Sequence, residues 1–129
     1  MPLEDYNLVL GTNSFPSKYH FSTDSEMIEQ AKQTRALGSN IFKTSITVKQ
    51  LKNYGYKAND ATKIMDVMNL IPDYDKIFKM DFKYFFFWLH TATGIDWKHG
   101  ISSKQEKMLY NEMYDFTTYM LKKHNNTFF

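Results

Sequence analysis

The hydrophobic pattern of the chain is a series of short apolar runs, each followed by a segment with helical spacing. The most apolar run is KYFFFWLHT at residues 83–91, and similar runs at residues 6–12 and 40–46 precede it. A short continuous apolar run is typical of a strand in a parallel sheet, where crossover helices hide both faces from water. The pattern therefore predicts three parallel strands, with the third covered on both faces.

Helical spacing follows each predicted strand, and it predicts main helices at about residues 24–37, 60–71 and 103–124. Thr23 to Glu26 and Ser103 to Glu106 have capping-box spacing at the starts of the first and third helices. The second helix has an apolar face formed by Ile64, Val67, Met68 and Ile71. The inward residues of the third helix are predicted to be Leu109, Met113, Phe116 and Met120.

Three shorter features complete the pattern. Gly38 is placed to end the first helix in a left-handed cap. A short helix is expected around Val48 and Leu51, and Pro72 ends the second helix and starts a short turn at residues 73–80. The resulting order, β-α-β-α-β-α with parallel strands, is an α/β fold that suits either part of a barrel or a doubly wound sheet.

Size and composition narrow the class of protein. The chain has 129 residues, a net charge of +2 and no cysteine, so we expect one domain without disulfides or thiolate metal sites. Basic residues are dispersed and Arg35 is the only arginine, which does not favour a nucleic-acid partner. No apolar run has membrane-spanning length, and MPLEDYNLVL has no signal-peptide pattern. We therefore expect no membrane partner and a cytoplasmic location by default.

Four segments together resemble a known family. They are YNLVLGT (6–12), EMIEQAKQTRALGSNIFKTSI (26–46), KYFFFWLH (83–90) and MLYNEMYDFTTYMLKKHNNTFF (108–129). They resemble the N-terminal part of a family of bacterial TIM-barrel proteins similar to retaining-clan glycoside hydrolases. The resemblance implies a partial (half) (β/α)8 barrel over residues 1–129, with Thr127 to Phe129 at the start of a fourth strand.

The resemblance also implies a function that this chain holds only in part. Retaining glycosidases use two carboxylates about 5–5.5 Å apart, and in this clan these are expected at the ends of strands four and seven, which the chain lacks. No catalytic residue is therefore assigned, and the chain alone is expected to contact carbohydrate without hydrolysing it. No Walker loop, GxGxxG or GxSxG motif is present, so no cofactor is expected.

Candidate site residues follow from the rule that parallel α/β folds place their sites at the C-terminal ends of strands. The predicted carbohydrate-binding residues are His90, Trp97, Asn13, Tyr19, Lys43 and Asp96. His90 closes an apolar strand and can hydrogen-bond a sugar hydroxyl, although it can equally satisfy a neighbouring carbonyl. Trp97 can stack on a pyranose ring, whereas Trp88, inside a strand, is expected in the core.

Two alternatives from other classes stay open. The chain can be a non-enzymatic half-barrel or a flavodoxin-like domain that self-associates through open sheet edges. It can also be a metal-dependent barrel of the sugar-isomerase type, with ligands drawn from His20, His90, Asp96 and His99. The spacing of those residues matches no standard metal motif.

Overall fold

A computed structural model describes residues 11–13, 22–89, 98–125 and 127–129. The fold is mixed α/β, which confirms the predicted class at that level. The chain divides into two compact units that alternate along the sequence. Unit 1 consists of Met1–Thr44, Asp73–Trp88 and Asn126–Phe129, and unit 2 consists of Ser45–Pro72 and Leu89–Asn125.

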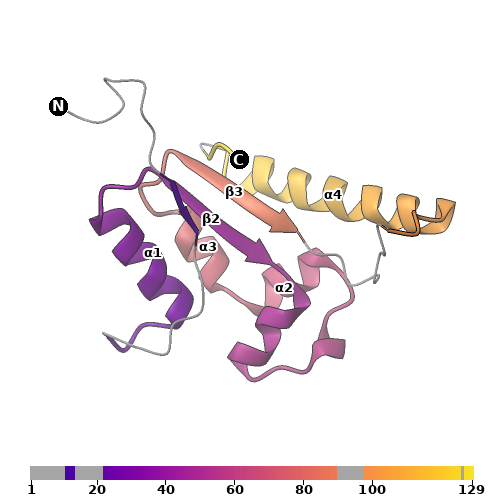
Figure 1. Ribbon diagram of the computed structural model, residues 1–129, viewed down its shortest axis with the longest axis horizontal. Helices are drawn as coiled ribbons and strands as arrows, with labels where there is room; N and C mark the ends of the chain where they lie inside the picture. The colour runs from indigo at the N-terminus through magenta and orange to yellow at the C-terminus, as the bar shows by residue number, and fades with distance from the viewer. Residues whose placement is uncertain (1–10, 14–21, 90–97, 126) are drawn as a thin grey trace. The chain divides into compact units, whose positions relative to one another are not determined.

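Three strands form one sheet in the order β1, β2, β3 (Figure 1). The strands are β1 (Gly11–Asn13), β2 (Ile41–Ile46) and β3 (Tyr84–Leu89). β1 runs parallel to β2, and the arrows of β2 and β3 point the same way in Figure 1. At the start of β3, the N–H groups of Lys83 and Tyr84 donate to the Asn40 carbonyl at 2.9 and 3.2 Å. The second and third predicted strands are confirmed, whereas residues 6–10 of the first lie outside the described residues.

The helix α1 (Glu26–Ala36) begins after Ser25. The Ser25 hydroxyl accepts a hydrogen bond from the N–H of the third helical residue at 3.3 Å, so it satisfies one of the amides that lack a partner inside the helix. The same hydroxyl donates to the carboxylate of Asp73, the first residue of α3 (Asp73–Phe78). The predicted cap at Thr23 is wrong, because Ser25 directly precedes the helix and Thr23 lies two residues too early.

An aromatic cluster joins α3 to the strands and forms the core of unit 1. The ring of Phe78, in α3, lies 5.4 Å from that of Phe85 and 5.2 Å from that of Phe87, both in β3. The ring of Phe82, just before β3, lies 5.5 Å from Phe85 and 5.2 Å from Phe42 in β2. Aromatic rings bury large apolar areas and favour such tilted and edge-on contacts. α3 therefore covers the face of the sheet that bears Phe42 and Phe85.

The opposite face of β2 and β3 is exposed. Successive side chains of a strand point to opposite faces, and Phe86 and Trp88 are 58% and 57% exposed while Phe85 is 2% exposed. In β2, Lys43 is likewise exposed and its neighbour Phe42 is buried. The expectation that β3 is covered on both faces is therefore wrong, and so is the expectation that Trp88 lies in the core.

Phe128 pairs with β3 along the edge that faces away from β2. Tyr84 and Phe128 form a parallel bridge, and the Phe85 N–H donates to the Phe128 carbonyl at 2.8 Å. Consecutive N–H groups of a strand point to opposite edges, so Tyr84 donates toward β2 and Phe85 donates toward Phe128. The spatial order of β1, β2, β3 and Phe128 thus follows their order in the chain.

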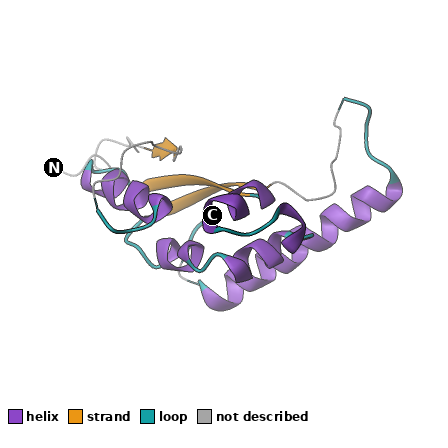
Figure 2. Cartoon of the chain, turned by 90° about the horizontal axis from the view of Figure 1, so that it is seen from below, coloured by secondary structure: helices purple, strands orange, loops and turns teal. Residues whose placement is uncertain are grey.

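Apart from the last residues of β2 and β3, the secondary structure in the described part of unit 2 is helical. They are the 3₁₀ helices η2 (Val48–Tyr54) and η3 (Ala58–Asp60) and the α-helices α2 (Ile64–Leu70) and α4 (Ser103–Lys123). α2 packs against α4, which is a single unbroken helix (Figure 2). The predicted apolar face of α2 is confirmed, because all its members are buried: Ile64, Val67, Met68 and Ile71. Within the described residues, every helix is too short or too polar to cross a membrane.

Several helix ends differ slightly from the predicted boundaries. α2 begins at Ile64 rather than near residue 60. α4 is capped by Ser102, whose side chain accepts from the Gln105 N–H at 3.2 Å, so the predicted cap at Ser103 is one residue late. Gly38, after α1, has φ +89°, which confirms the predicted left-handed position that glycine tolerates best.

Phe-to-Ala substitutions at two adjacent positions of β3 test whether only one face of this strand is buried. We expect Phe85→Ala to lower the free energy of unfolding by about 3–5 kcal/mol, because it leaves a cavity in the aromatic core. Phe86→Ala should lower it by less than about 1 kcal/mol, because that ring is exposed. Urea unfolding followed by circular dichroism measures both changes. Equal destabilisation by the two substitutions would contradict the described burial.

Candidate functional site

The structure describes only some of the predicted carbohydrate-binding residues. Lys43 lies in β2 with an exposed side chain, and its Cα is opposite that of Asn13 in β1. These two predicted positions are therefore neighbours on adjacent strands. The other four predicted residues lie outside the described residues: Tyr19, His90, Asp96 and Trp97.

Of the residues that the sequence offers as metal ligands, the structure describes fewer still. His99 is described, whereas His20, His90 and Asp96 are not. Within the described ranges, no group of three or more His, Cys, Asp or Glu side chains could hold a metal ion. The metal-dependent alternative thus stays a prediction from sequence.

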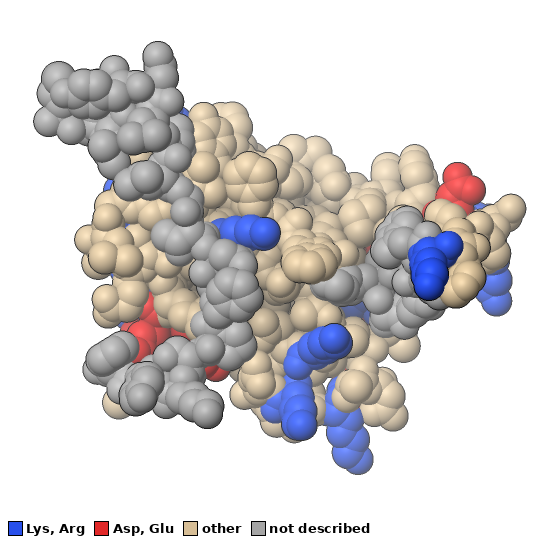
Figure 3. Space-filling view, viewed as in Figure 1, with Lys and Arg blue, Asp and Glu red and all other residues tan. Residues whose placement is uncertain are grey.

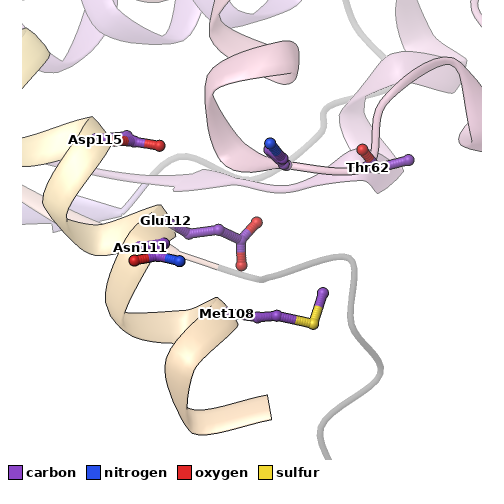
Figure 4. Close-up of a pocket in the computed structure, with 6 residues that line it drawn as sticks. Thr62, Met108, Asn111, Glu112 and Asp115 are labelled. Atoms are coloured by element: carbon purple, nitrogen blue, oxygen red, sulfur yellow. The ribbon is translucent and has the colours of Figure 1, made fainter. Parts of the chain in front are cut away.

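A pocket of about 260 Å³ lies within unit 2, between α4 and the segment that leads into α2 (Figure 4). Its lining residues are Thr62, Lys63, Met108, Asn111, Glu112 and Asp115. The four lining residues from α4 are spaced three or four apart or adjacent, so they share one side of the helix. Ligand pockets for drug-sized molecules span roughly 300–1,000 Å³, so this pocket suits a smaller molecule or a single side chain.

Glu112 is the buried member of the lining, with 6% of its surface exposed. Figure 4 shows its side chain extending from α4 toward the segment that carries Thr62. Its Oε1 atom accepts a hydrogen bond at 3.2 Å from the N–H of Ile64, the first residue of α2. The first N–H groups of a helix have no partner within it, and a carboxylate there is favoured by the helix dipole. Glu112 therefore joins α4 to the start of α2.

Asp66 fixes the turn that forms the pocket rim. Its Oδ2 atom accepts from the Thr62 N–H at 3.0 Å, the Thr62 hydroxyl at 3.2 Å and the Lys63 N–H at 3.1 Å. These hydrogen bonds, the Thr62 N–H above all, hold the pKa of Asp66 below its usual value. Because these bonds form only if the helix starts after Lys63, they explain why α2 begins later than its apolar pattern predicts.

The Oε2 atom of Glu112 is buried and has no hydrogen-bond partner among the described residues. Burial raises the pKa of the Glu112 carboxyl, and the nearby Asp66 carboxylate acts in the same direction. The Ile64 N–H and the Lys63 charge oppose this rise. A buried polar atom without a partner costs roughly 1–3 kcal/mol.

The pocket lining carries hydrogen-bond acceptors and donors. Glu112 and Asp115 accept without donating when they are ionised. The Thr62 hydroxyl already donates to Asp66, so toward the pocket it offers oxygen lone pairs. The remaining lining residues are Lys63, Met108 and Asn111. Lys63 and Asn111 carry N–H donors, so the lining offers polar groups of both kinds.

Analysis of the sequence alone missed Glu112. Of the residues predicted to point inward from α4, Phe116 and Met120 are buried and Leu109 and Met113 are half-buried. Glu112 lies three residues after Leu109 and four before Phe116, so it interrupts the apolar side of the helix. The sequence signal that could have identified Glu112 is a charged residue at a position that helical spacing places on the apolar side of the helix.

Comparisons with known proteins give no family assignment. No protein-family model, curated protein or solved structure matches the chain. The resemblance to glycoside-hydrolase-like barrels therefore stays an interpretation of the four quoted segments.

The pH dependence of stability tests the burial of Glu112. The folded state binds the Glu112 proton more tightly than the unfolded state does, because the folded pKa is raised above about 4.5. We therefore expect this group to make the free energy of unfolding fall as pH rises from about 4.5 through the folded pKa, and to contribute a constant penalty above it. Asp66, whose folded pKa is lowered, contributes the opposite trend at lower pH.

Glu112→Gln cannot ionise and should lose the Glu112 part of this pH dependence. Glu106→Gln, the same change at an exposed position of α4, should retain it. Urea unfolding across the acidic to neutral range measures the slope for each protein. An unchanged slope in Glu112→Gln would show that the carboxyl is not perturbed in the folded state.

Proposed function

We propose that the chain is the N-terminal part of a (β/α)8 barrel that contacts carbohydrate at the C-terminal ends of its strands. The observation that best supports this is the strand order, in which β1, β2, β3 and Phe128 lie side by side in chain order. A barrel adds each strand beside the previous one, whereas a doubly wound sheet reverses direction at a switch point. Consecutive order therefore favours the barrel over the flavodoxin-like alternative.

The packing of helices in unit 1 agrees with this proposal. Right-handed crossovers between strands added in one direction place all their helices on one face of the sheet. α1 and α3 pack against each other, and the Ser25 hydroxyl donates to Asp73 where the two helices begin. The uncovered face, which carries Phe86 and Trp88, corresponds to the inside of a barrel, where bulky side chains from opposite strands fill the centre.

The carbohydrate part of the proposal depends on the resemblance and on two described side chains. Lys43 and Trp88 are both exposed on the uncovered face. The Lys43 ammonium has three N–H groups for sugar hydroxyls, and the Trp88 indole has a flat apolar surface for a pyranose ring. In this proposal, His90 and Trp97 add further contacts at the ends of the strands.

Carbohydrate binding without turnover is the expected outcome. Isothermal titration against a panel of mono- and oligosaccharides should detect binding, and Lys43→Ala should weaken it about tenfold by removing a charged hydrogen-bond donor. Lys49→Ala, at an exposed position of η2, is the matched control and should not weaken it. Aryl-glycoside assays should show no product release, since the resemblance implies paired carboxylates on strands four and seven and not on strands one to three. Clear turnover, or no binding to any member of the panel, would refute the proposal.

Self-association is a second candidate function, favoured by the exposed aromatic rings of the uncovered face. Phe86 and Trp88 are more than half exposed, and Phe128 beside them in the sheet is 65% exposed. Most of the described surface in Figure 3 is uncharged, and its Lys and Arg side chains lie at several separate places. Large uncharged surfaces with exposed rings are typical of interfaces.

Light scattering coupled to size-exclusion chromatography tests self-association. We expect a concentration-dependent dimer, and we expect Phe86→Lys to shift it to monomer by placing a charge in the apolar contact. Leu37→Lys, at a residue that is 80% exposed after α1, controls for the loss of a surface hydrophobic side chain elsewhere and should leave the dimer intact. A monomer at every concentration would exclude this function.

A further inference from the structure

We infer that the carbohydrate bound by the uncovered face of the sheet carries a negative charge, as a uronic acid or a sulfated sugar does. This ligand class rests on the proposed carbohydrate-binding function of the same face. The observation that supports it is the distribution of charge in unit 1. The described acidic residues of this unit lie in α1, in α3 or in the loops next to these helices, whereas the exposed charged side chain on the uncovered face is Lys43.

Lys43 lies beside an exposed aromatic residue of the neighbouring strand. The Tyr84 N–H donates to the Asn40 carbonyl at 3.2 Å, and in a parallel pair this bond places Tyr84 beside Ile41. Two residues further along both strands, the same register places Phe86 beside Lys43, with about 4.8 Å between the strands. Both side chains are exposed, so an ammonium group and an apolar ring share one patch of surface.

The surroundings of Lys43 favour an anion. The ion pairs described in unit 1 use other bases: Lys32 with Asp24 at 2.7 Å, Arg35 with Asp81 at 3.3 Å, and Lys76 with Asp73 at 3.4 Å. On the uncovered face, the described neighbours of Lys43 in unit 1 are uncharged: Ile41, Tyr84, Phe86 and Trp88. Figure 3 likewise shows a blue side chain over the strands with no red atoms next to it. An anionic group beside Lys43 therefore meets an opposite charge, and no like charge from the described part of this face.

An acidic sugar matches both parts of this patch. Its ring has an apolar face that can lie on Phe86 or Trp88, and its carboxylate or sulfate can accept a charge-assisted hydrogen bond from the Lys43 ammonium. A neutral sugar makes the same ring contact but offers Lys43 only a hydroxyl group. Because exposed ion pairs are weak, we expect acidic sugars to bind about three- to fivefold more tightly than neutral ones.

Isothermal titration of the full chain with trigalacturonate and with its methyl ester tests this preference. The two ligands share the same sugar skeleton, and the ester lacks the charge. We expect the acid to bind about three- to fivefold more tightly in about 20 mM salt, and the difference should shrink in about 0.5 M salt, which screens exposed charges. A sulfated galactose trisaccharide and its unsulfated parent form a second pair, which distinguishes a sulfate from a carboxylate as the preferred group. Sodium acetate at matched concentrations should not bind saturably, because it lacks the sugar ring.

Four variants connect the preference to Lys43. Lys43→Gln keeps N–H donors but removes the charge, so it should bind the acid and the ester equally, whereas Lys43→Arg should retain the preference. Trp88→Ala should weaken the binding of both ligands by the same factor, because the ring contact does not depend on charge. Lys49→Gln, at an exposed position of η2, is the matched control and should keep the preference. Each substituted side chain is exposed, so we expect all four variants to fold.

The outcomes separate this ligand class from carbohydrate binding in general. Equal affinity of the acidic and neutral members of both pairs would overturn the inference and leave the proposed carbohydrate binding intact. A preference that persists in Lys43→Gln would also overturn it, because the charge would then come from another residue. If neither pair binds, the inference is wrong, and the other sugars of the panel then decide separately whether the face binds carbohydrate at all.

Discussion

Burial of the Phe85 ring against α3 is the contact on which unit 1 depends. Phe78 and Phe82 pack against Phe85 from two other segments, and Phe82 extends the contact to β2. Because strand side chains alternate, the register that buries Phe85 exposes Phe86 and Trp88. One packing choice therefore produces both a dense aromatic core and an uncovered apolar face, and the two proposed functions of the sheet use that face.

In unit 2, polar contacts stabilise the start of the short helix α2. α2 is shorter than two full turns, a length at which a helix depends on contacts outside itself. Asp66 ties the preceding turn together, and Glu112 reaches from α4 to the first amide of the helix. The two oxygens of Glu112 thus have different surroundings: Oε1 accepts from the first amide of α2, and Oε2 is buried without a partner among the described residues.

Local pattern predicted which segments form strands and helices and which face of α2 is buried, but not which face of β3 is buried. The run around Phe85, Phe86 and Trp88 is apolar at every position, so its composition carries no alternation from which an exposed face could be recognised. Ser25, and not Thr23, caps the first helix, and its hydroxyl also donates to Asp73, a contact with a residue distant in sequence that local pattern does not give. Helical spacing alone places Glu112 on the apolar side of α4. Whether each of its carboxylate oxygens finds a hydrogen-bond partner depends on where α2 lies, and the local pattern does not give that position. The rim residues His90 and Trp97 stay predictions.

The pairing of Phe128 with Tyr84 has a consequence for the order of folding. The two residues are separated in sequence by most of β3, a loop and the whole of α4, so closing this contact requires a large loss of chain entropy. Contacts of such wide sequence separation form slowly compared with a helical turn or a local aromatic cluster. Asn40 and Tyr84, which join β2 to β3, are as far apart in the sequence as Tyr84 and Phe128, so both edges of β3 are paired after the local contacts. A nascent or partly unfolded chain would present those edges to other strands.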